Sequence, residues 1–121
     1  MSEDSVVLDS SALLAHFHEE PGADAVEAAL LRRPLMSSVN WCEVLDVAAR
    51  RGKDPEGYLA LVDVVPLTLE HARASVRYRL PGLSLGDRCC LALADTLSSS
   101  VLTADSAWER VGGPAEVQLI R

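Results

Sequence analysis

The sequence is poor in aromatic side chains and contains a single lysine. Phe, Trp and Tyr together make up 4% of the 121 residues, whereas apolar residues as a whole make up 49%. A core built with few large rings must come from Leu, Val and Ala, which is typical of helices packed on a sheet of aliphatic strands. The length corresponds to one domain, residues 1–121, which can bury a core without a disulfide or a structural metal.

The sequence also lacks a long apolar run and a positively charged N-terminus. No uncharged stretch approaches the ~20 residues that a membrane-spanning helix needs, and residues 1–5 are acidic, unlike a secretory signal. The cysteines are odd in number, and Cys89 and Cys90 are adjacent, which disfavours a disulfide framework or a zinc site. We therefore expect a cytoplasmic protein with no membrane interaction, whose cysteines are small buried apolar residues.

Positive charge is scarce, with 18 acidic residues against 11 basic ones and a net charge of −7. Proteins that bind nucleic acid tightly and without sequence preference are usually basic, so the composition argues against that class. Two divalent cations on an acidic cluster would add four positive charges and move the balance from −7 to −3. An enzyme that contacts phosphate through bound metal is therefore compatible with this composition.

Short apolar runs alternate with segments of helical periodicity along the chain. The expected strands are residues 6–8, 35–38, 64–65, 101–103 and 117–120. The expected helices are residues 10–15, 23–33, 39–51, 54–62, 69–79, 84–94 and 105–110. This alternation predicts an α/β fold with a mostly parallel central sheet of about four or five strands between helical layers. Ligands bind such sheets beyond the carboxyl ends of the strands.

Four acidic residues lie near this expected edge of the sheet. Asp9 directly follows the first strand, and Asp105 lies two residues beyond Thr103 at the end of a later strand. Glu43 lies one turn into the helix after the second strand, and Asp87 lies in the first turn of the most apolar helix. Carboxylates held close together need a compensating cation, and hard oxygen ligands suit Mg²⁺ or Mn²⁺.

Each of these acids also has a plainer interpretation as a helix cap. Asp9 and Asp105 each precede an expected helix, where a cap contributes ~1 kcal/mol. Residues 84–87 and 40–43 both have the spacing of a capping box, the second with Asn40 in the cap position. The residue pattern by itself leaves metal binding and capping open at all four positions.

Four segments of the chain resemble, in order, the four motifs of PIN domains in VapC-type toxins. They are residues 6–15 with Asp9, 37–45 with Glu43, 82–94 with Asp87 and 102–108 with Asp105. Together they extend over nearly the whole chain, and none of the four acidic positions is substituted. The Cys89–Cys90 pair and the near-absence of lysine depart from the family pattern. The scarcity of lysine bears only on the expected substrate groove, because Arg can replace Lys electrostatically.

The resemblance implies a PIN-like three-layer α/β/α sandwich and hydrolysis of RNA phosphodiester bonds. Asp9, Glu43, Asp87 and Asp105 are then the catalytic and metal-binding residues, and Mg²⁺ or Mn²⁺ activates the attacking water. The implied partners are the RNA substrate, a cognate antitoxin protein and a second copy of the chain in a homodimer. We also hypothesise that the antitoxin blocks the acidic pocket with a basic side chain.

Several polar residues have both a supporting and a purely structural interpretation. Thr103 either orients Asp105 or a metal-bound water, or is an ordinary β-branched strand residue. Asn40 is either a polar group of the site or a helix cap. Arg88 either contacts RNA or an antitoxin, or is a surface residue.

Other residue groups are expected to be structural, or have a structural alternative. The two tryptophans are expected to pack on the sheet instead of stacking on bases, and the three histidines, too scattered for a metal motif, are expected to be structural or surface residues. The leucines of the first two helices form either a dimer face or ordinary core. These residues are Trp41 and Trp108; His16, His18 and His71; and Leu13, Leu14, Leu30 and Leu31.

Two other function classes compete with the nuclease interpretation. A receiver-type signalling domain needs paired early acids and a lysine after a late strand, but the only lysine, Lys53, follows a helix in the middle of the chain. A catalytically silent PIN domain, acting as an RNA-binding or protein-interaction module, is the more serious alternative. The intact set of four acids disfavours it.

Overall fold

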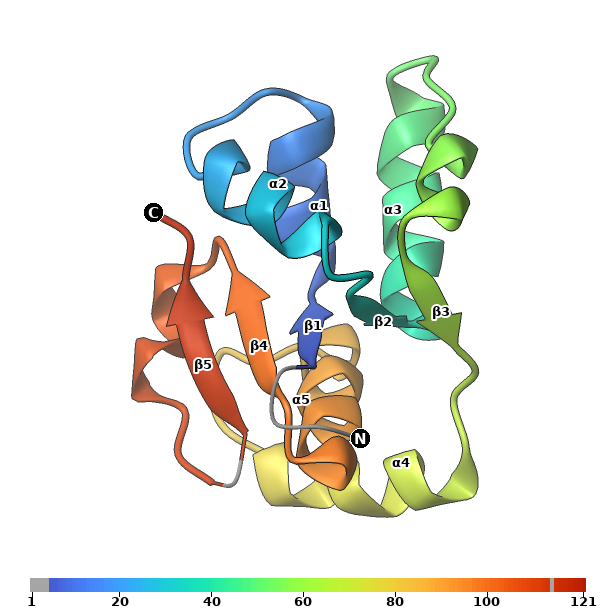
Figure 1. The fold of residues 1–121 in the computed structure, drawn as a ribbon. Coiled ribbons are helices and arrows are strands. Elements are labelled where there is room, and N and C mark those ends of the chain that lie inside the picture. Colours follow the sequence, from blue (N-terminus) through green and yellow to red (C-terminus); the bar gives the residue numbers. More distant parts are fainter. Residues whose placement is uncertain (1–4, 114) are drawn as a thin grey trace.

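The computed structural model describes residues 5–113 and 115–121, in which strands and helices alternate along the chain (Figure 1). The strands are β1 (Val6–Leu8), β2 (Leu35–Ser37), β3 (Asp63–Val65), β4 (Ser100–Thr103) and β5 (Glu116–Leu119). The α-helices are α1 (Ser10–Phe17), α2 (Ala23–Leu30), α3 (Ser38–Arg50), α4 (Leu69–Ala74) and α5 (Leu85–Leu97). The 3-10 helices are η1 (Glu56–Ala60), η2 (Ser75–Tyr78) and η3 (Ser106–Arg110).

The strands form one sheet in the order β3-β2-β1-β4-β5, and every pair is parallel. Strands β1, β2 and β3 follow one another toward one edge of the sheet, and β4 then pairs with the other side of β1. The direction of strand order therefore reverses between β1 and β4, where open α/β sheets bind their ligands. The expected mostly parallel sheet is confirmed.

Helices cover both faces of the sheet, as Figure 1 shows for α1, α2 and α3 on one side and α4 and α5 on the other. Successive strand residues point to opposite faces. Val6 and Leu8 of β1 pack with Leu13 in the core beneath α1, α2 and α3. Val7, between them, packs with Trp108 in the core beneath α5 and η3. The three-layer α/β/α sandwich expected from the resemblance is confirmed.

The largest differences from the predicted helices are at residues 54–62, at residues 69–79 and at the end of α2. Residues 54–62 contain only the short 3-10 helix η1, and residues 69–79 divide into α4 and η2; 3-10 turns are common in connectors and at helix ends. Helix α2 ends at Leu30 because Arg33 takes a left-handed backbone conformation (φ 50°) and Pro34 disfavours helix before it.

The structure also corrects one expectation about apolar side chains and bears on a second that was left open. Cys89 and Cys90 are buried, but Cys42 is exposed on the solvent side of α3, so the prediction of a buried cysteine is wrong there. Among the leucines considered for a dimer face, Leu13 and Leu30 belong to the core, whereas Leu31 is 84% exposed. Core packing thus accounts for most of that set.

The tryptophans pack as expected. Trp108 is fully buried between η3 and the sheet, and Trp41 packs partly buried against the opposite core. No helix within residues 5–113 and 115–121 combines the length and the hydropathy needed to cross a bilayer.

Candidate active site

Asp9 and Asp105 follow the two strands at which the strand order reverses. Strands β1 and β4 pair in register, with Leu8 opposite Leu102, and the Asp9 N–H donates to the Leu102 carbonyl oxygen at 3.1 Å. Asp9 is the N-cap of α1, and Asp105 is the N-cap of η3. Both acids therefore cap a helix, and both lie at the edge of the sheet where ligands bind.

The Asp9 carboxyl group is 3% exposed and surrounded by donors. Its Oδ1 accepts the Ala12 N–H at 2.8 Å, and its Oδ2 accepts the Thr103 hydroxyl at 2.6 Å. The Ser11 hydroxyl lies 2.8 and 2.9 Å from the two oxygens. Burial raises the pKa of Asp9 to about 6, although these hydrogen bonds lower it, and the charge of Asp87 adds a further increase. The buried anion is therefore only partly compensated by the protein.

Two hydroxyl groups tie Asp9 to the segment that carries Asp105. The Thr103 Oγ1 accepts the Asp105 N–H at 3.0 Å, and the Ser11 Oγ accepts the Ala104 N–H at 2.9 Å. Thr103 thus bonds to the Asp9 carboxyl group and to the backbone of Asp105, and its supporting role stays a prediction. Ser11 was not among the predicted site residues, because a serine two residues after a helix cap is common.

Glu43 extends from α3 and is held at one carboxylate oxygen. Its Oε1 accepts the Ser10 hydroxyl of α1 at 3.0 Å and the Asn40 side-chain N–H at 2.8 Å. Asn40 is 1% exposed, and its Nδ2 also donates to the Gly86 carbonyl oxygen of α5 at 3.2 Å. Asn40 therefore joins α3, Glu43 and α5.

The predicted capping role of Asn40 is wrong. The N-cap of α3 is Ser37, whose hydroxyl accepts the Val39 N–H at 3.2 Å. Helix α3 begins three residues earlier than a capping box at 40–43 requires, because β2 leads directly into it. Ser10, like Ser11, is a site contact that the sequence analysis missed.

Gly86 provides the space in which the Glu43 carboxylate lies against α5. A Cβ atom at this glycine would be 2.5 Å from Glu43 Oε2. Real Cβ atoms do not approach oxygen so closely, so any side chain at Gly86 would displace the carboxylate. Gly86 lies in the third motif, but the sequence predicted no role for it.

Asp87 forms the capping box that the sequence predicted for α5. The Ser84 N–H donates to Asp87 Oδ2 at 2.9 Å, and the Asp87 N–H donates to Ser84 Oγ at 3.1 Å. Burial raises the pKa of Asp87, the Ser84 contacts lower it, and the negative charges of Glu43 and Asp105 raise it further. Asp87 thus interacts electrostatically with each of the other three acids, because its charge also raises the pKa of Asp9.

The donor set at this edge of the sheet has the chemistry that a hard divalent cation requires. Glu43 Oε2, Asp87 Oδ1 and Asp105 Oδ2 have no hydrogen-bond partner among the described residues. The buried Asn40 Oδ1 also lacks a partner there. However, no three His, Cys, Asp or Glu side chains in residues 5–113 and 115–121 are arranged to enclose an ion. The residues fit a cation held partly through water, as Mg²⁺ often is.

Arg88 turns away from this cluster. It is half-buried, and its Nε donates to the Ser75 carbonyl oxygen at 3.4 Å, toward η2. The histidines lie elsewhere in the fold, and His71 completes a capping box with Thr68 at the start of α4.

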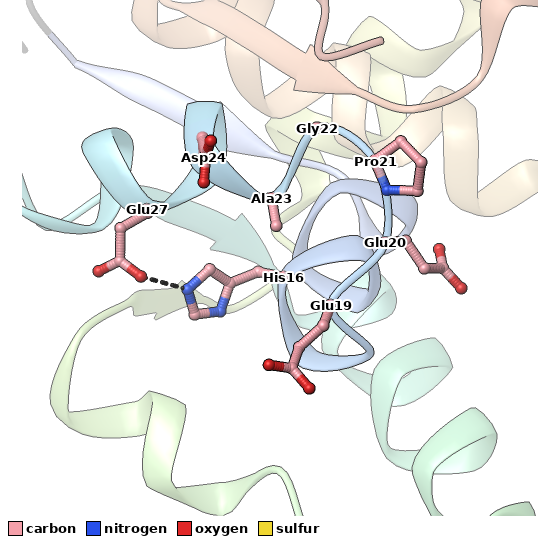
Figure 2. Close-up of a pocket in the computed structure, with 8 residues that line it drawn as sticks. All are labelled: His16, Glu19, Glu20, Pro21, Gly22, Ala23, Asp24 and Glu27. Atoms are coloured by element: carbon pink, nitrogen blue, oxygen red, sulfur yellow. Dashed lines mark hydrogen bonds and ion pairs between the residues drawn. The ribbon is translucent and has the colours of Figure 1, made fainter.

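A separate pocket of about 540 Å³ lies at the α1–α2 turn (Figure 2). Figure 2 shows the His16 ring directed toward Glu27, and the two are 2.8 Å apart. The same ring contacts the Tyr58 hydroxyl at 2.6 Å. None of the four site acids lines this pocket, which therefore does not belong to the cluster.

Comparison with solved structures identifies similar folds. A chain of the DNA-bound VapBC complex from Salmonella typhimurium aligns with a TM-score of 0.76 and 15% identity, over 97% of this chain and 98% of that one. VapBC2 from Rickettsia felis, bound to a fragment of promoter DNA, gives 0.75 and 11%, over 94% and 97%. A toxin–antitoxin complex from Klebsiella pneumoniae gives 0.70 and 23%, over 93% and 99%.

Sequence comparison gives a more specific result. No curated protein matches the chain significantly. A family model described as the PIN domain matches residues 6–114, which include all four acids. The match extends over most of the chain and agrees with the three-layer fold, and the chain therefore belongs to the PIN domain family.

Proposed function

We propose that this PIN domain is a VapC-type toxin, a ribonuclease that hydrolyses RNA phosphodiester bonds at Asp9, Glu43, Asp87 and Asp105 with Mg²⁺ or Mn²⁺. The observation that carries the proposal is the electrostatic coupling of Asp87 to the other three acids at the switch point of the sheet. A fold that only needed helix caps would have no reason to bring these four charges together.

The protein side of the chemistry follows from the contacts. Asp9 is a buried anion whose charge needs a cation. Ser10 and Asn40 both donate to Oε1 of Glu43, which leaves Oε2 available to a ligand. Asp87 and Asp105 are held by the backbone N–H groups of Ser84 and Ala107. A divalent ion held by these carboxylates would supply an acidified water and would neutralise charge on the phosphoryl oxygens.

The same proposal includes partners and location. The similar structures come from VapBC and toxin–antitoxin complexes, which supports a cognate antitoxin as a partner. We propose that the antitoxin places a basic side chain against the acidic cluster, and that the toxin acts on RNA in the cytoplasm as a homodimer. An antitoxin complex that retains full nuclease activity would contradict the blocking mechanism.

One observation favours a second candidate, a catalytically silent PIN domain that binds RNA or protein. Within the described residues, the acids are not arranged as a ready-made metal site. If the carboxylate side chains did not move together to coordinate a cation, the cluster would have no Lewis acid and could not activate water.

The deciding experiment measures cleavage of structured and single-stranded RNAs by the wild type and Asp9→Asn, with and without Mg²⁺ or Mn²⁺ and without antitoxin. Metal-dependent cleavage that Asp9→Asn abolishes and the exposed control Asp24→Asn retains would support the nuclease. RNA binding without cleavage by any variant would favour the silent module. Equal cleavage by wild type and Asp9→Asn would refute the assignment of the site.

A further inference from the structure

An apolar groove of about 300 Å³ adjoins the acidic cluster. One wall is the turn at residues 80–83, and the other is formed by Ala107, Arg110 and Val111 of η3 and its C-terminal end. Both walls are held in place: the Leu83 N–H donates to the Leu80 carbonyl oxygen at 3.2 Å, and the buried Trp108 anchors η3 in the core. The groove is therefore part of the folded structure.

Each wall is joined directly to one acid of the cluster. The Ala107 N–H donates to Asp105 Oδ1 at 2.9 Å, so the η3 wall begins at that carboxylate. The turn at residues 80–83 leads at once into Ser84, which forms the capping box with Asp87. The groove therefore lies beside the segments that carry Asp87 and Asp105.

Two arginines beside the groove are available to contact a polyanion. Residues 71–86 contain three arginines and no acid, but Arg77 is already paired with Asp95 at 2.9 Å. Arg110 lines the groove, is exposed, and has no ion pair or side-chain hydrogen bond among the described residues. Arg79, just before the turn, is likewise exposed and has no such partner there.

We infer that this groove binds one nucleotide of single-stranded RNA beside the cleaved phosphate, an inference that rests on the proposed ribonuclease function. The base lies on the aliphatic surface of Leu80, Pro81 and Leu83, and a neighbouring phosphate lies at Arg110. Bases outside a duplex can pack between apolar side chains, whereas bases within a duplex are stacked and inaccessible. The groove therefore accepts a base from a single strand and excludes a paired one.

The groove also limits how the base is recognised. Among the described residues that line the groove, Arg110 alone has a side chain with hydrogen-bonding groups. A surface that contacts mainly the faces of bases accepts many sequences. The groove therefore contributes affinity and strand selectivity, and base identity has little effect there.

The test fills the groove with Ala107→Phe and compares it with Ala28→Phe, an equal enlargement at an exposed position of α2. We expect Ala107→Phe to raise KM for a single-stranded RNA about tenfold, with a much smaller change in kcat, because a contact made equally in ground and transition states affects KM. Arg110→Ala should weaken RNA binding and reduce the salt slope of log K by about 0.7, the contribution of one phosphate contact on a single strand. Arg110→Lys should retain the slope.

A cross-linking measurement separates this inference from the nuclease proposal. Asp9→Asn is mixed with an oligonucleotide carrying 4-thiouridine and irradiated, and the linked peptides are mapped. Cross-links to residues 80–83 or 107–111 that disappear when Ala107→Phe is added to Asp9→Asn would support the groove. This result would hold even if the wild type cleaved nothing. Cleavage by the wild type together with unchanged KM in Ala107→Phe and unchanged binding by Arg110→Ala would overturn the groove and leave the nuclease intact.

Discussion

Asp9 is a buried carboxyl group whose ionisation opposes folding. Its pKa is 3.8 in a solvated chain and about 6 in the folded protein. Below pH 4 both states are protonated and there is no penalty. Above pH 6 both are ionised, and the folded state has lost about 3 kcal/mol relative to a group with an unshifted pKa. Stability contributed by this residue therefore falls as pH rises from about 4 to about 6.

Asp9→Asn should consequently stabilise the metal-free protein at neutral pH. We expect a free energy of unfolding higher by up to about 3 kcal/mol above pH 6, and a difference that disappears below pH 4. Urea unfolding in EDTA across this pH range measures it. Asp24→Asn, at an exposed position of α2, is the matched control and should show little change at any pH. A lower stability of Asp9→Asn at neutral pH would contradict the argument.

Individual contacts of the site could be predicted from sequence only where they are local. The Ser84–Asp87 capping box spans three residues, so its spacing was visible. Ser10 reaches Glu43 across 33 positions, and Thr103 reaches Asp9 across 94. Contacts of that range depend on how helices and strands pack, which no single-sequence pattern contains. The catalytic role of the four acids stays a prediction.

At the scale of the elements, the contact between α3 and α5 determines where the Glu43 carboxylate lies. Helix α5 presents Gly86 where Glu43 crosses it, and Asn40 bridges both helices. Gly86→Ala would place a Cβ atom 2.5 Å from Glu43 Oε2. The carboxylate is the end of a flexible side chain, so it can move aside without unfolding the helix.

We therefore expect Gly86→Ala to reduce RNA cleavage by at least about tenfold, on the order of a misplaced catalytic group, while stability is unchanged or higher. Alanine is favoured over glycine in a helix by about 1 kcal/mol, which offsets the displaced contacts. Thermal unfolding and cleavage rates, measured on the same preparation, separate the two effects. Gly57→Ala in η1 is the control, because no atom lies within 4 Å of its added Cβ. Full activity in Gly86→Ala would refute the role assigned to this contact.

The order of elements was more predictable than their extents. Strands β1, β2 and β4 are short, mostly apolar and buried, as central parallel strands need to be, and all five strands were located to within two residues. The predicted helix at residues 54–62 is wrong, because its apolar residues Leu59 and Leu61 are exposed and do not form a packed helical face. The strand pattern placed the four acids near one edge of the sheet but left capping and metal binding open, and the resemblance to PIN domains, a family that the family model confirms, favoured a shared catalytic site.

For the whole molecule, the net charge of −7 and the buried Asp9 both oppose the folded state without a cation. A divalent ion that binds the folded cluster and not the unfolded chain raises stability by RT ln(1 + [L]/Kd), about 3 kcal/mol at a hundredfold excess over Kd. Binding requires ionised carboxylates. The effect should therefore be large above pH 6 and small at pH 5, where Asp9 is mostly protonated.

Thermal unfolding of the wild type in MgCl₂, compared with NaCl of the same ionic strength, measures this stabilisation. Specific binding predicts a dose-dependent increase in Tm that NaCl does not reproduce, since general screening of the acidic surface acts through ionic strength alone. Asp9→Asn should lose most of the increase, and Asp24→Asn should keep it. If Asp9→Asn responds to Mg²⁺ as strongly as the wild type, the ion binds elsewhere on the acidic surface and the cluster is not a metal site. An increase in Tm that requires the intact cluster and grows as pH rises through 6 would support the metal site. It would mean that the bound ion offsets the free energy cost of the buried, ionised Asp9 carboxylate.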